Sequence, residues 1–199
     1  MTVLGRFIVL EGIDGSGTTT QAKRLAEALE GRGTPVLRTF EPTPGPVGKL
    51  IRRALQHQLT SEDGAARALS AGTMALLFAA DRADHLDTVV RPALADGVTV
   101  ICDRYDLSSL AYQSVTSRDG AAAVPWIRTL NAHAVRPDLT LVLDVSDEVA
   151  SARRAARGGQ PELFEVAAIQ RRLAEVYRTA ERLVPGDPLV HVPDGTAED

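Results

Sequence analysis

The stretch Phe7-Ile8-Val9-Leu10-Glu11-Gly12-Ile13-Asp14-Gly15-Ser16-Gly17-Thr18-Thr19 decides the fold of this 199-residue chain. A short apolar run is followed by a glycine-rich loop, and apolar residues then recur with helical spacing over residues 21–30. Glycines allow a loop backbone to wrap an anion with its N–H groups, and the start of the following helix adds positive partial charge. Residues 12–19 therefore predict a phosphate-binding loop, in which the Thr19 hydroxyl is placed to bind Mg²⁺.

One position of this loop departs from the common phosphate-loop pattern. In G-x-x-x-x-G-K-[ST] the lysine reaches the β- and γ-phosphates, and this chain has Thr18 at that position. Lys23 lies more than one helical turn further on, so its side chain is expected to point away from the phosphates. We therefore expect arginines from elsewhere in the chain to supply the missing charge. The loop alone also leaves open a glycine-rich turn that binds no ligand.

Four further apolar runs complete the pattern of a layered fold. With residues 7–10, the expected strands are 35–39, 98–102, 139–143 and 189–192. Segments with helical spacing of apolar residues alternate with these runs, over 21–30, 65–87, 122–131, 147–157 and 163–183. This alternation predicts a three-layer α/β fold with a parallel five-stranded sheet flanked by helices. In such a sheet, ligands bind beyond the carboxyl ends of the strands.

Composition limits the classes of function. The chain has the length of one domain, and 44% of its residues are hydrophobic, so we expect residues 1–199 to fold as a single domain. The net charge of −4 disfavours nucleic-acid polymers and anionic membranes as partners. Cys102 is the only cysteine, which excludes a disulfide or zinc framework within the chain. No apolar stretch reaches the ~18 residues that cross a bilayer, and the sequence predicts a cytoplasmic protein.

Several separated motifs occur along the chain in a specific order. They are the first strand and loop at 7–17, Glu41-Pro42, Phe78-Ala79-Ala80-Asp81-Arg82, Asp103-Arg104-Tyr105 with Ser108, Ser109, Tyr112 and Gln113, and Arg136-Pro137-Asp138-Leu139. Together they resemble the thymidylate kinases over nearly the whole chain. The resemblance implies a P-loop kinase fold that transfers the γ-phosphoryl group of ATP to dTMP, gives dTDP and ADP, requires Mg²⁺ and acts as a homodimer. It also implies that all eight loop residues, from Gly12 to Thr19, bind ATP.

The same resemblance implies where the acceptor nucleotide binds. Asp14 resembles the loop carboxylate that contacts the sugar 3′-hydroxyl, and Phe78 resembles the aromatic residue that stacks on thymine. Arg82 lies four residues after Phe78, on the same helical face, and can donate to a base carbonyl. Arg104 resembles the cation that binds the acceptor phosphate. Asp14 and Arg104 are also expected to be catalytic residues.

Further contacts are implied at the ends of two strands and on the segment after residue 104. Glu41 is expected to contact the acceptor, and Ser109 and Gln113 are expected at the edge of its base. Tyr112 resembles the residue that crowds a ribose 2′-hydroxyl and so selects deoxynucleotides. Asp103 is expected to bind Mg²⁺ together with the loop hydroxyl, because a carboxylate can hold a metal-bound water. A carboxylate there can alternatively orient Arg104.

Residues 153–165 resemble the lid that closes over ATP in this family. Arg153 and Arg157 are four residues apart and share a helix face, whereas Arg154 is expected to point elsewhere. Gly15 stands where some members carry an arginine, and the resemblance then implies that lid arginines supply the catalytic charge. Arg153 and Arg157 are therefore the expected catalytic residues of the lid.

Two alternatives to a dTMP kinase stay open at this point. The family's lid motif Asp-Arg-x-Glu reads here Glu162-Leu163-Phe164-Glu165, so the chain lacks a lid arginine as well as the loop lysine. A non-catalytic nucleotide-binding sensor module would fit these two losses. A kinase for another nucleotide or for a deoxynucleoside would fit the same loop, and turnover of a set of acceptors distinguishes the three readings.

Overall fold

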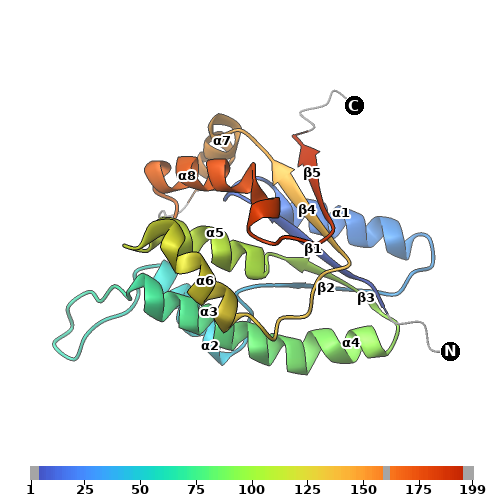
Figure 1. The fold of residues 1–199 in the computed structure, drawn as a ribbon, viewed down its shortest axis with the longest axis horizontal. Helices are drawn as coiled ribbons and strands as arrows, with labels where there is room; N and C mark the ends of the chain where they lie inside the picture. Colours follow the sequence, from blue (N-terminus) through green and yellow to red (C-terminus); the bar gives the residue numbers. More distant parts are fainter. Residues whose placement is uncertain (1–4, 159–161, 195–199) are drawn as a thin grey trace.

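The computed structural model describes residues 5–158 and 162–194, and its centre is a parallel sheet of five strands (Figure 1). The strands lie in the order β2-β3-β1-β4-β5, and every neighbouring pair is parallel. Their bounds are β1 Phe7–Gly12, β2 Val36–Phe40, β3 Thr99–Asp103, β4 Leu139–Asp144 and β5 Leu189–Pro193. The predicted sheet is confirmed, and each strand end lies within two residues of its predicted position.

Apolar side chains on both faces of the central strands explain the layers. On β1, Phe7 and Val9 pack in one apolar cluster, whereas Leu10 packs in another, with Ala22 and Ile101. Successive strand residues point to opposite faces, so the two clusters lie on the two sides of the sheet. Helix α1 (Thr18–Glu30) covers the side of Leu10. Fully burying an apolar side chain of this kind contributes about 1.5–3 kcal/mol, which favours the two-sided covering.

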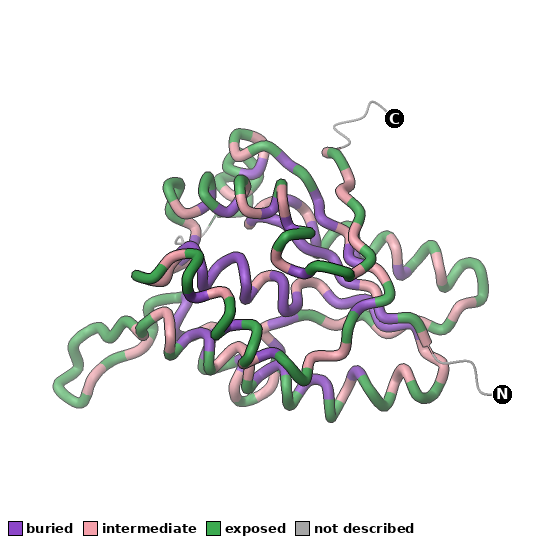
Figure 2. The backbone as a smooth tube through the Cα atoms, viewed as in Figure 1, coloured by how far each residue is buried: buried purple, intermediate pink, exposed green. Residues whose placement is uncertain are grey.

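The other helices lie in the connections from β2 to β3, from β3 to β4 and from β4 to β5 (Figure 1). They are α2 Pro46–Leu55, α3 Ala71–His85, α4 Arg91–Ala95, α5 Asp106–Thr116, α6 Val124–Leu130, α7 Asp147–Arg157 and α8 Ala167–Tyr177. A π-helical turn at Leu86–Val90 joins α3 to α4, and 3₁₀ turns lie at Gly120–Ala123 and Ala180–Arg182. Buried residues are concentrated in the strands and on the inward faces of the helices (Figure 2).

Several helix boundaries differ from the predicted ones. The expected helix at 65–87 begins only at Ala71, because Ser70 caps it by accepting from the N–H of Thr73 at 3.1 Å. The expected helix at 163–183 is reduced to α8, with the short 3₁₀ turn after it. Helix α2 was not among the predicted helices; Pro46 is its first residue, a position that proline favours. Helix α5 was not predicted at all.

The strand topology brings the motif residues to one edge. Strands β1, β2 and β3 are adjacent and parallel, so Gly12, Phe40 and Asp103 end at the same side of the sheet. The loop 12–19, Glu41 and Arg104 follow these ends directly. Within the described residues, no helix has both the length and the apolar character needed to cross a lipid bilayer.

Candidate active site

The phosphate loop connects β1 to α1 and presents its backbone to a cleft. Gly15 and Gly17 have φ values of 88° and 96°, a conformation that glycine adopts without steric cost. Helix α1 begins at Thr18, and among the described residues no side chain caps its first N–H groups at Gly17. These N–H groups therefore remain available for an anion. Ile13 is buried in the core, so it contributes to the loop through its backbone.

Thr19 and Asp103 meet beside the loop. Thr19 Oγ1 donates to Asp103 Oδ2 at 2.5 Å, and Asp103 Oδ1 is buried with no hydrogen-bond partner in the described part of the chain. Hydroxyl and carboxylate oxygens are the ligands that Mg²⁺ takes together with phosphate oxygens and waters. Residues 5–158 and 162–194 contain no group of three or more His, Cys, Asp or Glu side chains able to hold a metal by themselves. The pair therefore fits a metal shared with a bound phosphate.

A cleft of about 710 Å³ lies over the loop and is rich in arginine. Its arginines are Arg38, Arg52, Arg104, Arg153, Arg154 and Arg157. Arg153 pairs with Asp194 at 3.1 Å, and Arg157 pairs with Glu165. Arg38 is exposed and has no ion pair among the described residues. The cleft thus holds several cations although its loop has no lysine, and both expected lid arginines line it.

Arg154 lines this cleft as well, so the expectation that it points elsewhere is wrong. Its guanidinium donates to the carbonyl oxygen of Asp14 and pairs with Asp147 at 3.4 Å. Arg154 precedes Arg157 by three residues, and this spacing shares a helix face as the spacing of four does. Gly15 permits the approach, because a Cβ there would lie 3.1 Å from Cγ of Arg154.

The expected lid at 153–165 is seen in two parts, because residues 159–161 lie outside the described residues. After this gap, the N–H of Leu163 donates to the carbonyl oxygen of Leu55 at 2.8 Å, and its side chain packs against the core. Phe164 packs on Tyr112 with ring centroids 5.5 Å apart. Leu163, at the position of the family's lid arginine, therefore joins this segment to α2 through its backbone and packs its side chain against the core.

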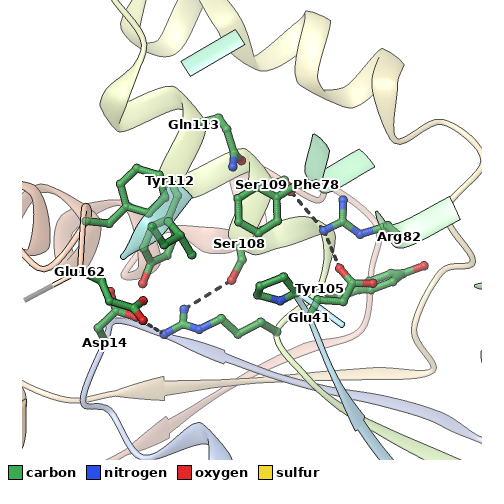
Figure 3. A pocket seen from close by; sticks show the side chains of 14 residues that line it. Asp14, Glu41, Phe78, Arg82, Tyr105, Ser108, Ser109, Tyr112, Gln113 and Glu162 are labelled. Atoms are coloured by element: carbon green, nitrogen blue, oxygen red, sulfur yellow. Dashed lines mark hydrogen bonds and ion pairs between the residues drawn. The ribbon is translucent and has the colours of Figure 1, made fainter. Parts of the chain in front are cut away.

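A second cavity, of about 120 Å³, adjoins the cleft (Figure 3). All eight residues that were expected to contact the acceptor line it, namely Asp14, Glu41, Phe78, Arg82, Arg104, Ser109, Tyr112 and Gln113. Asp14, Glu41 and Arg104 line both this cavity and the arginine-rich cleft. The two spaces therefore meet at these three side chains.

Polar atoms in the wall of this cavity are buried without a hydrogen-bond partner in the described part of the chain. They are Tyr105 Oη, Tyr112 Oη, Gln113 Oε1 and Arg82 Nε. Buried polar groups in folded proteins are almost always hydrogen-bonded, so this set indicates a polar ligand. In Figure 3, Asp14 and Arg82 lie toward opposite ends of the cavity, and Phe78 supplies an aromatic ring to its wall.

Arg82 is held in a buried network at the far end of the cavity. Its guanidinium forms an ion pair with Glu41 at 2.7 Å, and it donates to Ser109 Oγ at 3.1 Å and to Asn131 Oδ1. His85 Nδ1 lies 3.1 Å from the second oxygen of Glu41. Burial opposes the charge of Arg82 most strongly, but the combined effect of Glu41, Asp106 and Tyr105 leaves the pKa of the guanidinium raised. Arg82 therefore stays charged inside the protein.

Arg104 occupies the junction between the two spaces. Its backbone has φ of 70°, a left-handed conformation that costs a non-glycine residue about 1–2 kcal/mol. Its side chain donates to the carbonyl oxygen of Gly12 at 2.6 Å and to Asp14 Oδ1 at 2.7 Å. The guanidinium also lies over the ring of Tyr112, 5.2 Å from its centroid. These contacts aim Arg104 at the space shared by the cleft and the cavity.

Two buried residues at this site were not predicted from the sequence. Glu11 accepts from the N–H groups of Tyr105 and Ser108, at 2.8 and 3.1 Å, and so ties β1 to the start of α5. Burial raises the pKa of Glu11 to about 7, although Arg104 and the hydrogen bonds lower it. A charged residue at the end of an apolar run is a signal that could have identified Glu11. Gln170 contacts Asp14 from α8, and no local pattern marks it.

The comparisons with known proteins agree with this geometry. A family model described as Thymidylate kinase matches residues 10–187. A protein of Pyrococcus horikoshii named "Probable thymidylate kinase" is 45% identical over 181 residues, which cover 91% of this chain and 85% of that protein. A "Thymidylate kinase" of Xanthomonas oryzae pv. oryzae is 40% identical over 196 residues, covering 98% of this chain and 78% of that protein. The chain therefore belongs to the thymidylate kinase family.

Proposed function

We propose that this chain transfers the γ-phosphoryl group of ATP to dTMP and releases dTDP and ADP. The observation that carries the proposal is the junction at Asp14, Glu41 and Arg104, where the cleft over the phosphate loop meets the polar and aromatic cavity. A donor phosphate over the loop and an acceptor phosphate beside Arg104 would face each other across this junction. The family to which the chain belongs favours thymidylate as the acceptor.

The acceptor would occupy the smaller cavity. Phe78 would stack on the base, while Arg82, Ser109 and Gln113 would meet its polar edge. Tyr112 would lie against the sugar and disfavour a 2′-hydroxyl. The carboxylate of Asp14 would accept from the 3′-hydroxyl, because it stands at the cavity's boundary with the loop. Each of these groups already lines the cavity, so no rearrangement of the chain is required to bring them together.

ATP would lie along the phosphate loop, with residues 12–19 around its phosphates. A third cleft, of about 690 Å³, continues from the loop and is lined by Gly17, Thr20, Arg153 and Asp194 among others. Gly17, Thr20 and Arg153 line this cleft and the arginine-rich one alike, so the two are continuous at the loop. The nucleoside part of ATP would occupy this third cleft while its phosphates remain over the N-terminus of α1.

The residues of the chain act by positioning and by charge. Phosphoryl transfer passes through a loose transition state, so no protein nucleophile is needed. Arg104 would hold the acceptor phosphate in line, and Arg153 and Arg157 would neutralise charge on the moving group. The hydroxyl of Thr19 and the carboxylate of Asp103 would hold Mg²⁺. Positive charge supplied there by a bound Mg²⁺ would offset the negative charge of the phosphates.

We also propose that residues 1–199 act as one kinase domain with a lid at 153–165, and that two copies associate in the cytoplasm. Leu76 on α3 and Trp126 on α6 are large apolar side chains, 52% and 44% exposed, that would be available to a second copy. Cys102 is buried and free, as in proteins of a reducing compartment.

Incubation of the purified protein with ATP, Mg²⁺ and one acceptor at a time tests the proposal. We expect ADP and dTDP to form, and dTMP to turn over faster than dUMP, other nucleoside monophosphates or thymidine. Faster turnover of thymidine would instead identify a deoxynucleoside kinase. Thr18 and Leu163 favour a sensor as the second candidate, and binding of both nucleotides without ADP formation would support it.

A further inference from the structure

Gln170 lies in the first part of α8 and is completely buried. Gln170 is not one of the described residues that line the arginine-rich cleft or the acceptor cavity. It therefore touches neither nucleotide in the proposed arrangement. Its amide nevertheless makes hydrogen bonds to Asp14 and Phe164. This buried amide therefore connects the phosphate loop to α8 and to the segment just before α8.

The amide of Gln170 holds Asp14 at two atoms. Its Oε1 accepts from the backbone N–H of Asp14 at 3.1 Å, and its Nε2 donates to Asp14 Oδ2 at 2.7 Å. The other carboxylate oxygen, Oδ1, accepts from Arg104 at 2.7 Å. Backbone and carboxylate of Asp14 are thus fixed from two sides. This double contact determines the direction in which Asp14 faces the cavity.

The same amide also binds the last part of the lid segment. Nε2 of Gln170 donates to the carbonyl oxygen of Phe164 at 2.8 Å. Phe164 packs on Tyr112, and Tyr112 lies under the guanidinium of Arg104. The contacts therefore form a closed ring from Gln170 through Phe164, Tyr112, Arg104 and Asp14 back to Gln170. A shift of the segment at Phe164 changes the support of Asp14.

We propose that Gln170 is a positioning residue that orients the carboxylate of Asp14 toward the 3′-hydroxyl of the acceptor and couples this orientation to the lid segment at Phe164. The inference rests on the proposed function. A neutral amide suits the role, because it donates to the carboxylate without adding a charge that would compete for phosphate. The carboxylate oxygens of Asp14 keep further lone pairs that can accept from a hydroxyl.

A comparison of two acceptors tests the role in Gln170→Met, which keeps the volume of the side chain and removes its hydrogen bonds. The acceptors are dTMP and 3′-deoxythymidine monophosphate, which lacks the hydroxyl in question. In the parent chain we expect kcat/KM to favour dTMP about 10- to 100-fold, the range for a hydrogen bond to a charged group. In Gln170→Met we expect this preference to fall below about threefold, with KM for ATP nearly unchanged.

Leu173→Ala is the matched control, because Leu173 lies on the same helix, is equally buried and packs only in the apolar core. This variant is expected to lower Tm and to keep the preference for dTMP. If Gln170→Met fails to fold, Gln170→Asn keeps an amide that is one methylene too short to reach Asp14 and Phe164 together, and the same loss of preference is expected.

Equal losses with both acceptors would overturn the inference, because they would mean that Gln170 only supports the fold. A parent chain that phosphorylates both acceptors equally well would also overturn it, since Asp14 would then make no use of the 3′-hydroxyl. A parent chain that phosphorylates neither acceptor would refute the proposed function itself, and this result is distinguishable from the other two.

Discussion

Helix α7 rests directly on the phosphate loop at Gly15, and this contact predicts a large effect of Gly15→Ala on turnover. A Cβ at this position would lie 2.4 Å from the carbonyl oxygen of Ala150. Ala150 is buried in the apolar core, so its backbone does not move independently of the helix. The same helix carries Arg153 and Arg157, the proposed catalytic arginines of the lid.

The size of the effect follows from this distance. Ordinary van der Waals contact begins at 3.4 Å, so α7 must retreat by about 1 Å, a misplacement that costs on the order of 100-fold in rate. We expect kcat to fall by about this factor while KM for dTMP changes less than about threefold. The φ of 88° at Gly15 adds a backbone strain of about 1–2 kcal/mol for alanine, which lowers stability.

The variant Gly186→Ala separates the effect of backbone strain from that of the close contact with α7. Gly186 precedes β5 and has φ of 92°, but its added Cβ would meet no heavy atom of the described residues within 4 Å. Both variants are expected to lose stability in thermal unfolding, Gly15→Ala the more because α7 must also move, and only Gly15→Ala to lose turnover at saturating ATP and dTMP. Equal kcat in the two variants would refute the reasoning, because the packing of α7 on the loop at Gly15 would then have no part in placing the arginines.

Three further perturbations test the charges of the site. Thr18→Lys is expected to raise kcat less than about threefold, whereas Arg157→Ala lowers it about 100-fold with ATP affinity nearly unchanged, because guanidinium groups replace the lysine. Steady-state kinetics that show a strong gain from lysine and no loss from Arg157→Ala would contradict this. Burial raises the pKa of Glu11 from 4.5 to about 7, so the native state keeps a proton that the unfolded chain releases. The contribution of this proton to stability is lost as pH rises from about 4.5 to about 7. In urea unfolding at pH ~5 and ~8, Glu11→Gln should lose up to about 3 kcal/mol less than the parent over this interval, and equal losses would exclude the effect. Arg82→Met is expected to destabilise the fold by about 3–5 kcal/mol, because it leaves Glu41 buried without its cation. Urea unfolding measures the loss of stability, and a loss below about 1 kcal/mol would contradict this prediction.

The sheet could be predicted because its strands are continuous apolar runs with glycine or proline nearby. Helix boundaries were less predictable, since they depend on single capping contacts such as that of Ser70 with the N–H of Thr73. Helix α2 was missed because Pro46 reads as a loop residue, although proline is well suited to the first turn of a helix. The local spacing of apolar residues thus indicates the type of an element better than it indicates where the element begins and ends.

The candidate site residues were predicted from the resemblance to the thymidylate kinases. Asp14, Phe78 and Arg104 were expected together, and they line one cavity. Gln170 could not be found in this way, because its partner Asp14 is 156 residues away and α8 carries no motif. Arg154 was misjudged because only a spacing of four was considered, whereas its position depends on the missing side chain of Gly15.

The ion pairs of the cleft indicate how a loop without lysine can still gather charge around a phosphate. Arg153 and Arg157 are 41% and 61% exposed and pair with carboxylates, so their pairs are worth at most about 1 kcal/mol and can exchange for phosphate at little cost. Arg154 is only 9% exposed and is bound to the loop backbone, so it stays with the loop. A bound ATP would therefore draw Arg153 and Arg157 from their carboxylates, while Arg154 would keep α7 in contact with the loop. In the proposed arrangement, the charge that a loop lysine would hold permanently would be supplied only when the nucleotide binds.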